Sequence, residues 1–198
     1  GQLVGIATMP DLGLVPLIGQ PKDNIKNFYR TGVTTSNTIS LSSVSDKINF
    51  RASVSNMSNK GIIPNNSFDK QTINFLVGAN VSEKLYVEAK ANYIRQATEN
   101  RPYIGSNRRN VSFSLDYTAR HINLDWLKNY KNADGTMRTW NGNGGYPLNP
   151  YWMLNEFLND DRRDRLIGYV SLKYKFTNWL NLSLRSGTDF YSDLRNER

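Results

Sequence analysis

Cysteine is absent from this chain of 198 residues, and histidine occurs only once. Without cysteine, the chain has no disulfide framework and no thiolate chemistry. Zinc sites and catalytic triads place a histidine beside other reactive side chains. The sequence offers His121 alone and has no Gly-x-Ser-x-Gly nucleophile elbow. We therefore interpret the chain as one that is not an enzyme and that carries no metal and no other cofactor.

Long apolar runs are also missing. No stretch approaches the 18 apolar residues of a membrane-spanning helix. Residues 1–7 lack the basic start of a signal peptide. If the chain belongs to an exported protein, we expect it to be a mature form or an excised segment.

The positive charge of the chain is spread rather than concentrated. Its 25 basic and 17 acidic residues give a net charge of +8, a balance that would suit nucleic acid or an anionic surface. The basic residues form only short pairs, such as Arg108-Arg109 and Arg162-Arg163, and most lysines stand singly among polar residues. We therefore expect no nucleic-acid partner.

What the sequence does contain is period-two alternation, which is clearest in residues 164–191. Alternation of this kind predicts strands with one apolar and one polar face, here a hairpin that reverses at 177–179. In its first strand the apolar set is Leu166, Gly168, Val170, Leu172, Tyr174 and Phe176, and the other set is Ile167, Tyr169, Ser171, Lys173 and Lys175.

Four earlier stretches alternate in the same way, at about 34–43, 47–57, 70–81 and 84–96. The turns at 44–46, 82–83 and 177–179 are short, and the loops at 58–69 and 97–163 are long. Short turns at one end and long loops at the other are typical of an outer-membrane β-barrel. The prediction is an all-β, antiparallel, up-and-down transmembrane barrel segment of about six strands, with short periplasmic turns and long extracellular loops.

The domain organisation follows from these strands. Residues 1–33 are expected to be loop and strand lead-in, with one possible helical turn at 23–29. Residues 34–96 form four barrel strands, residues 97–163 a long extracellular loop, and residues 164–192 the last hairpin. Within the long loop, Asn123 is expected to cap a short helix to Tyr130. A turn is predicted at Asp134-Gly135, and a flexible tip at 141–145.

Several segments together resemble one known family. They are Asn27-Phe-Tyr-Arg-Thr-Gly32, Ser58-Asn-Lys-Gly-Ile-Ile-Pro-Asn65, Asn149-Pro-Tyr-Trp152 and Asn159-Asp-Asp-Arg-Arg-Asp-Arg165, which leads into the hairpin around 177–179. In their order and spacing they resemble the SusC/RagA type of TonB-dependent outer-membrane transporter from Bacteroidota. The resemblance covers roughly residues 24–193 and implies an internal segment of the barrel wall, because such transporters have about 22 strands around a plugged lumen.

The resemblance also implies a function, a location and partners. The function is TonB-dependent nutrient uptake of oligosaccharides or peptides across the outer membrane. The expected partners are a SusD-like surface lipoprotein, outer-membrane lipid, the remaining barrel and plug, and TonB through a part of the protein that is absent here. The alternative from the residues alone is a soluble β-sandwich that binds glycans or proteins through its aromatic loop.

Candidate ligand-binding residues fall into two groups. Aromatic side chains of the long loop could stack on a sugar or grip a peptide, or could pack the loop against the barrel rim; these are Trp126, Trp140, Tyr146, Tyr151 and Trp152. Charged residues on the polar strand faces could line the solute path, or could contact a plug; these are Arg51, Glu88, Lys90, Lys173 and Arg185.

Two groups of carboxylates have competing interpretations. Asp160, Asp161 and Asp164 could bind calcium, but the interleaved Arg162, Arg163 and Arg165 favour a salt-bridged rim over a metal site, and the spacing is not that of an EF-hand. Asp116 and Asp125 could act as a glycosidase pair, although nothing in the sequence sets their separation. We expect no catalytic role for either group.

Overall fold

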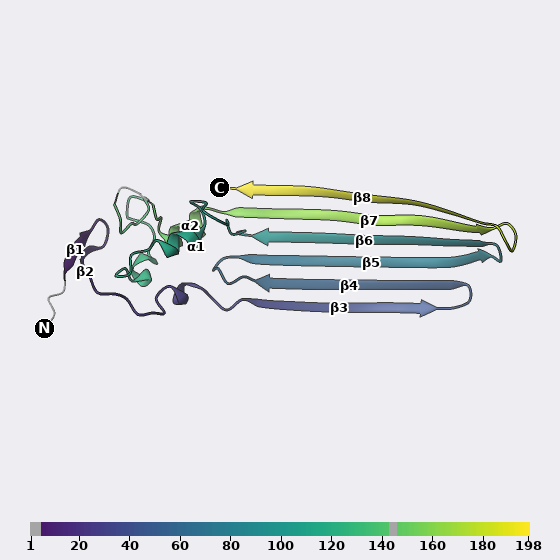
Figure 1. The fold of residues 1–198 in the computed structure, drawn as a ribbon, viewed down its shortest axis with the longest axis horizontal. Helices are drawn as coiled ribbons and strands as arrows, with labels where there is room; N and C mark the ends of the chain where they lie inside the picture. Colours follow the sequence, from purple (N-terminus) through teal and green to yellow (C-terminus); the bar gives the residue numbers. More distant parts are fainter. Residues whose placement is uncertain (1–4, 143–145) are drawn as a thin grey trace.

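Six long strands, paired antiparallel in sequence order, form one open sheet in the computed structural model (Figure 1). The structure describes residues 5–142 and 146–198. The sheet consists of β3 (Val33–Val44), β4 (Ile48–Lys60), β5 (Ser67–Ser82), β6 (Leu85–Glu99), β7 (Asn159–Lys175) and β8 (Asn181–Glu197). The predicted six-strand antiparallel meander is therefore confirmed, and the sheet is not closed into a barrel.

Strand pairing places every predicted apolar set on the same side of the sheet. Residues that pair directly across antiparallel strands point to the same face. One such row runs through all six strands as Ile39, Val54, Ile73, Tyr93, Leu166 and Phe190, and another as Leu41, Ala52, Phe75, Ala91, Gly168 and Thr188. We name this side the apolar face and the opposite side the polar face. Leu76 lies on the polar face, as its phase in the sequence indicates, paired with Arg51 and Lys90.

The strands reach further toward the long loops than the alternation predicts. The loop expected at 97–163 spans only 100–158, and the loop expected at 58–69 only 61–66. The charged residues 160–163, expected as loop, instead lie near the start of β7. Apolar alternation marks only the part of a strand with an apolar face, whereas backbone pairing continues wherever polar side chains can face water.

The buried core lies outside the sheet, in a body that we name the cap, formed by residues 6–29, 100–142 and 146–158. It contains β1 (Ile6–Met9), β2 (Gly13–Pro16), η1 (Lys26–Phe28), α1 (Val111–Asp116), η2 (Leu124–Leu127) and α2 (Pro150–Glu156). In Figure 1 the cap stands at the end of the sheet where the long loops are, opposite the short turns. Its buried side chains are Phe28, Val111, Leu115, Ile122, Leu124, Leu127, Met153 and Leu154.

Asparagine caps begin three helices of the cap, α1, η2 and α2. Asn149 accepts hydrogen bonds from the backbone N–H groups of Tyr151 and Trp152, and Pro150 follows it at the first helical position of α2. The Asn149 amide is itself buried and donates to the backbone oxygens of Leu127 and Arg138, at 3.1 and 2.9 Å. One side chain of the Asn149-Pro-Tyr-Trp152 segment therefore starts a helix and joins it to two other parts of the cap.

Parts of the cap differ from the sequence prediction. The stretch 1–33, expected as loop, holds the β1–β2 hairpin, whose four-residue strands are too short for a visible period-two pattern. Gly13 has a φ of 71°, a backbone conformation that favours glycine, and Val15 is buried against the cap. The all-β prediction also missed α1 and α2, since each is too short to show helical periodicity.

Three other local predictions agree with the structure, two of them with small differences in extent. A helical turn forms within 23–29 as η1, and Asn123 does cap a short helix, although that helix is η2 and ends at Leu127 rather than at Tyr130. The predicted turn at Asp134-Gly135 is present, with Gly135 at a φ of 82°. Of the predicted tip at 141–145, residues 143–145 lie outside the described residues.

Substituting Leu115 by alanine is predicted to destabilise the cap, because the Leu115 side chain is fully buried among apolar neighbours. We expect the free energy of unfolding of the cap to fall by about 2–5 kcal/mol, measured by denaturant unfolding with tryptophan fluorescence. Ile104→Ala is the matched control, since Ile104 is 85% exposed, and it should change little. Equal effects of the two substitutions would contradict the location of the core.

Candidate functional site

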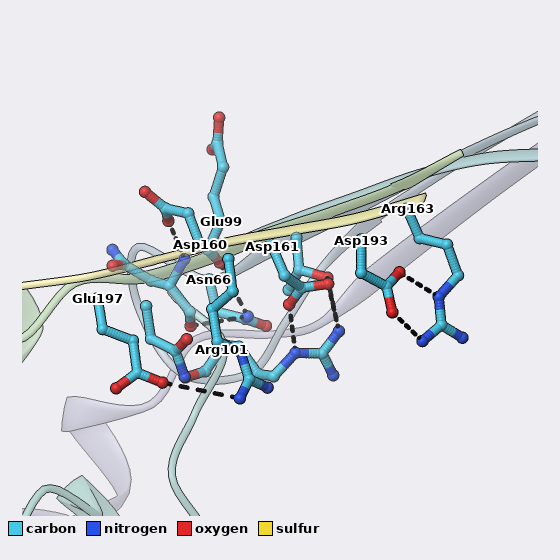
Figure 2. A network of polar contacts seen from close by, with 12 residues as sticks. Asn66, Glu99, Arg101, Asp160, Asp161, Arg163, Asp193 and Glu197 are labelled. Atoms are coloured by element: carbon cyan, nitrogen blue, oxygen red, sulfur yellow. Dashed lines mark hydrogen bonds and ion pairs between the residues drawn. The ribbon is translucent and has the colours of Figure 1, made fainter. Parts of the chain in front are cut away.

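A network of charged and amide side chains joins the cap to the sheet at the start of β7 (Figure 2). Arg101, just after β6, binds Asp161 with two hydrogen bonds, of which the Nη2–Oδ2 bond is 2.9 Å long. Arg163 on β7 binds Asp193 on β8 in the same forked manner, at 2.6 and 2.7 Å. The forked geometry is the strong form of an arginine–carboxylate pair. Asp161 also raises the pKa of Arg101, mainly through this hydrogen bonding.

The arginines of the predicted salt-bridged rim do form ion pairs, but only one of the three pairs lies among the expected carboxylates. Arg162 pairs with Asp164 on its own strand, whereas Arg165 pairs with Asp189 on β8. The reason is that successive residues of a strand point to opposite faces. An arginine therefore meets a carboxylate across the ladder or two residues along its strand, not its immediate sequence neighbour.

Asparagine side chains complete the junction between the cap and the sheet. The Asn66 amide donates to the backbone oxygens of Glu99 and Asn100, at 3.2 and 3.0 Å. Asp160 accepts the backbone N–H of Asn100 at 2.9 Å. Asn100 has a φ of 48°, so the chain turns sharply where β6 passes into the cap. Figure 2 shows Asn66, Glu99 and Asp160 grouped beside the Arg101–Asp161 pair.

A hollow of about 730 Å³ opens next to this network. Its wall mixes cations, carboxylates, an amide and two apolar side chains, a composition that suits a polar solute. The lining residues are Phe68, Gln96, Arg101, Asp161, Arg162, Arg163, Asp193, Leu194 and Arg195.

A second polar cluster lies further along the polar face, toward the short turns. Glu88 accepts hydrogen bonds from the hydroxyl of Tyr86 at 3.0 Å and from that of Tyr169 at 2.7 Å. The amine of Lys173 lies 5.8 Å from the centre of the Tyr86 ring, and the guanidinium of Arg185 lies 4.3 Å from that of Tyr169. Two rings and one carboxylate therefore position two cations.

Gly78 makes room for this cluster. A Cβ atom at Gly78 would lie 2.2 Å from the Tyr86 hydroxyl and 2.2 Å from the side-chain oxygen of Asn49. A glycine inside a strand often marks such a close approach. The Tyr86 side chain can therefore lie across β5 only because position 78 has no side chain.

The charged residues predicted to line the solute path all lie on the polar face. Arg51 and Lys90 both pair with Leu76 and so lie in one row across the strands. In the next row, Glu88 and Arg185 both pair with Ser171. Lys173 and Arg185 stand together beside Glu88, whereas Arg51 lies on β4, farther across the sheet. Sequence reasoning did not identify Tyr86, Tyr169, Arg101, Asp189 or Asp193, whose roles depend on which strands pair and in which register.

The predicted loop aromatics lie in separate places in the cap. Trp140 and Tyr151 pack against the buried core, and the Tyr151 ring meets Phe28 edge-on at 5.3 Å. Burial raises the pKa of Tyr151. Trp126 lines a hollow of about 250 Å³ beside the β1–β2 hairpin.

The two remaining aromatics each contact rings outside the predicted set. Tyr146 packs with Phe113 and Tyr117 at centroid distances of 5.6 and 5.7 Å, and burial raises its pKa. Trp152 meets Tyr130 at 6.1 Å, with the amine of Lys131 5.6 Å from its ring centre. The structure therefore distributes the five aromatics over several packing groups rather than one shared surface.

The residues considered for catalysis lie in the cap rather than in the two polar clusters. Asp125 pairs with Lys128 at 2.7 Å, and Asp116 is exposed at the end of α1. The backbone oxygen of His121 accepts a hydrogen bond from Gln20. Among residues 5–142 and 146–198, no three histidine, aspartate or glutamate side chains gather as a metal site would require. In the same residues, no helix is long and apolar enough to cross a membrane.

Comparison with known proteins gives no further identification. No protein-family model matches the chain, and no curated protein matches it significantly.

The Arg101–Asp161 pair is predicted to contribute measurably to stability. A double-mutant cycle of Arg101→Gln and Asp161→Asn should give a coupling energy of about 1 kcal/mol, because the partly buried pair is forked and charge-assisted. The same cycle on Lys128 and Asp125, whose side chains are 61% and 69% exposed, should give no measurable coupling. The readout is denaturant unfolding at low salt, and equal coupling in both pairs would contradict the assignment.

Proposed function

We propose that this chain is part of the wall of a TonB-dependent outer-membrane importer of the SusC/RagA type, which takes up oligosaccharides or peptides together with a SusD-like lipoprotein. The observation that supports this most strongly is the continuous apolar face of the six-strand sheet, opposite a face of charged and hydrogen-bonded residues. In a membrane barrel the apolar face meets lipid and the polar face lines the lumen.

The apolar face has no cover within the described residues. Ile39 is 81% exposed, Val170 51% and Phe190 66%. The only other sheet in the described part of the chain is the short β1–β2 hairpin, which belongs to the cap. Exposed apolar patches of this extent mark contact with a membrane or with another protein.

The extent of the apolar face fits a bilayer. On β7 its residues run from Leu166 to Tyr174, and Phe176 follows in the turn. At about 3.3 Å per residue, the span from Leu166 to Phe176 is roughly 33 Å along the strand. At the usual strand tilt of about 40°, this length corresponds to about 25 Å measured along the barrel axis. That height equals the apolar band of outer-membrane barrels.

Aromatic side chains stand at both borders of the band. At the turn end, Tyr174 and Phe176 pack edge-on at 4.7 Å, and Trp179 is 81% exposed. At the loop end, the Tyr93 hydroxyl donates a hydrogen bond to Asp164 at 2.6 Å. The Tyr93 ring therefore lies beside the apolar rows, and its hydroxyl lies beside the charged residues of the rim. Amphipathic rings in such positions suit the interface between lipid and water.

The open edges of the sheet support a role as part of a larger wall. β3 and β8 each pair on one side only, and a sheet in lipid must satisfy every backbone group. In the proposed importer, further strands pair with both edges, and a plug and a TonB-binding segment are supplied by other parts of the protein. The cap faces outward, where it would meet the lipoprotein and the incoming solute.

The membrane assignment is tested by placing one lysine on either face of β5. Phe75→Lys puts a charge in the middle of the apolar face and is expected to cost about 2–4 kcal/mol of stability in the bilayer. Asn74→Lys, one residue away on the polar face, is the matched control and should cost little. The measurement is outer-membrane yield and unfolding from vesicles of the native polypeptide that contains this chain.

The same experiment distinguishes the alternative of a soluble β-sandwich. A sandwich would cover the apolar face with a second sheet, and the native polypeptide would then be recovered in buffer without detergent. Recovery as a soluble protein, or equal membrane yields for the two lysine variants, would contradict the proposed location.

A further inference from the structure

Basic side chains outnumber carboxylates on the polar face of the sheet. Six of them form no ion pair with any residue in the described part of the chain: Arg51, Lys70, Lys90, Lys173, Lys175 and Arg185. Five of the six are exposed, and Lys70 is half-buried. This differs from the rim, where Arg101, Arg163 and Arg165 each hold a carboxylate in a fork.

Glu88 is the carboxylate nearest to Lys173 and Arg185, and each of its oxygens already accepts a hydrogen bond. Its two oxygens accept from the hydroxyls of Tyr86 and Tyr169. Those two rings lie beneath the amine of Lys173 and the guanidinium of Arg185. Glu88 therefore positions these two cations without forming an ion pair with either of them.

The cations are close enough to act on one molecule. Lys173 pairs with Ser183 and Arg185 with Ser171, so the two cations are diagonal neighbours on β7 and β8. The Cα atoms of such diagonal neighbours lie about 7–8 Å apart. Lys90 stands opposite Tyr169, one row further from the short turns. Three cations from three adjacent strands thus occupy three consecutive rows of the polar face, and the middle row also holds Glu88.

We propose that this part of the polar face binds an anionic solute, one that bears carboxylate, sulfate or phosphate groups. The proposal rests on the proposed function, because it takes the polar face to line the solute path. In the proposed barrel this face is the concave inner wall, and a concave wall with an excess of one charge sign concentrates ions of the opposite sign. Acidic sugars and acidic peptides share the required chemistry, whereas a neutral oligosaccharide would leave the cations without counter-charges.

Binding of charge-matched probes to the detergent-purified native polypeptide tests this proposal. The probes are tetragalacturonate with cellotetraose, and tetra-aspartate with tetra-asparagine, compared by titration calorimetry at low salt. We expect at least one acidic probe to bind about tenfold more tightly than its neutral counterpart, and the preference to shrink as salt rises. The pair that shows the preference tells an acidic sugar from an acidic peptide.

Matched variants connect the preference to these residues. The combined variant Lys90→Gln, Lys173→Gln and Arg185→Gln should weaken acidic-probe binding about tenfold. The variant Lys22→Gln, Lys26→Gln and Lys128→Gln removes the same charge from the exposed surface of the cap and should leave binding within about twofold, because exposed distant charges are screened.

Three results would overturn the proposal. One is equal affinity for acidic and neutral probes, and another is acidic-probe binding that survives the polar-face variant. The third is a variant that lowers the unfolding temperature of the assembled protein without changing probe binding, because the cations would then hold an acidic protein segment. None of these results affects the comparison of Phe75→Lys with Asn74→Lys, so failure of this proposal is distinguishable from failure of the membrane assignment.

Discussion

The in-register pairing of six antiparallel strands is the constraint on which the other features of the sheet depend. Because side chains alternate with a period of two, a slip of one residue in any strand would move its apolar set to the other face. The observed register holds Ile73 beside Val54 and Tyr93, and Glu88 in the same row as Arg185. The apolar face, the tyrosine–glutamate cluster and the excess of cations on the polar face all follow from this one register.

The chain divides its stabilising interactions between two bodies. The cap has a buried apolar core and helices that begin at asparagine caps, so it is held together as a water-soluble domain is. The sheet has no buried core among the described residues, and it is held by backbone pairing and by polar contacts, most of them on the polar face and at the rim. The forked Arg101–Asp161 pair and the Asn66 amide, which donates to the backbone oxygen of Asn100, join the two bodies at the rim. A sheet of this kind needs lipid or another protein against its apolar face.

The sequence allowed the sheet to be predicted, but only part of the site. Alternation identified six strands and the face of each residue, including the exception at Leu76, because side-chain direction in a strand depends only on local spacing. Strand ends near Asp160 and Lys60 were misjudged, since polar residues can continue a ladder without an alternation signal. The pairing of Arg163 with Asp193 and the placement of Tyr169 beside Glu88 required the register of distant strands. The β1–β2 hairpin and α2 were missed because packing against the cap core, not local periodicity, determines them.

The most direct test of the central claim is a cysteine scan of β7 in the native polypeptide, reconstituted in vesicles. These 198 residues contain no cysteine, so an introduced thiol is the only one in this segment. Residues 166–174 would be replaced singly, and their labelling by a small water-soluble maleimide compared with labelling by a lipid-dissolved one. The account predicts a period of two: Leu166, Val170 and Leu172 react only from the lipid, and Ile167 and Lys173 only from water. If the even-numbered positions react with neither reagent, a second protein layer covers the apolar face. If they react from water, the apolar face is exposed to solvent. Either result would contradict the account.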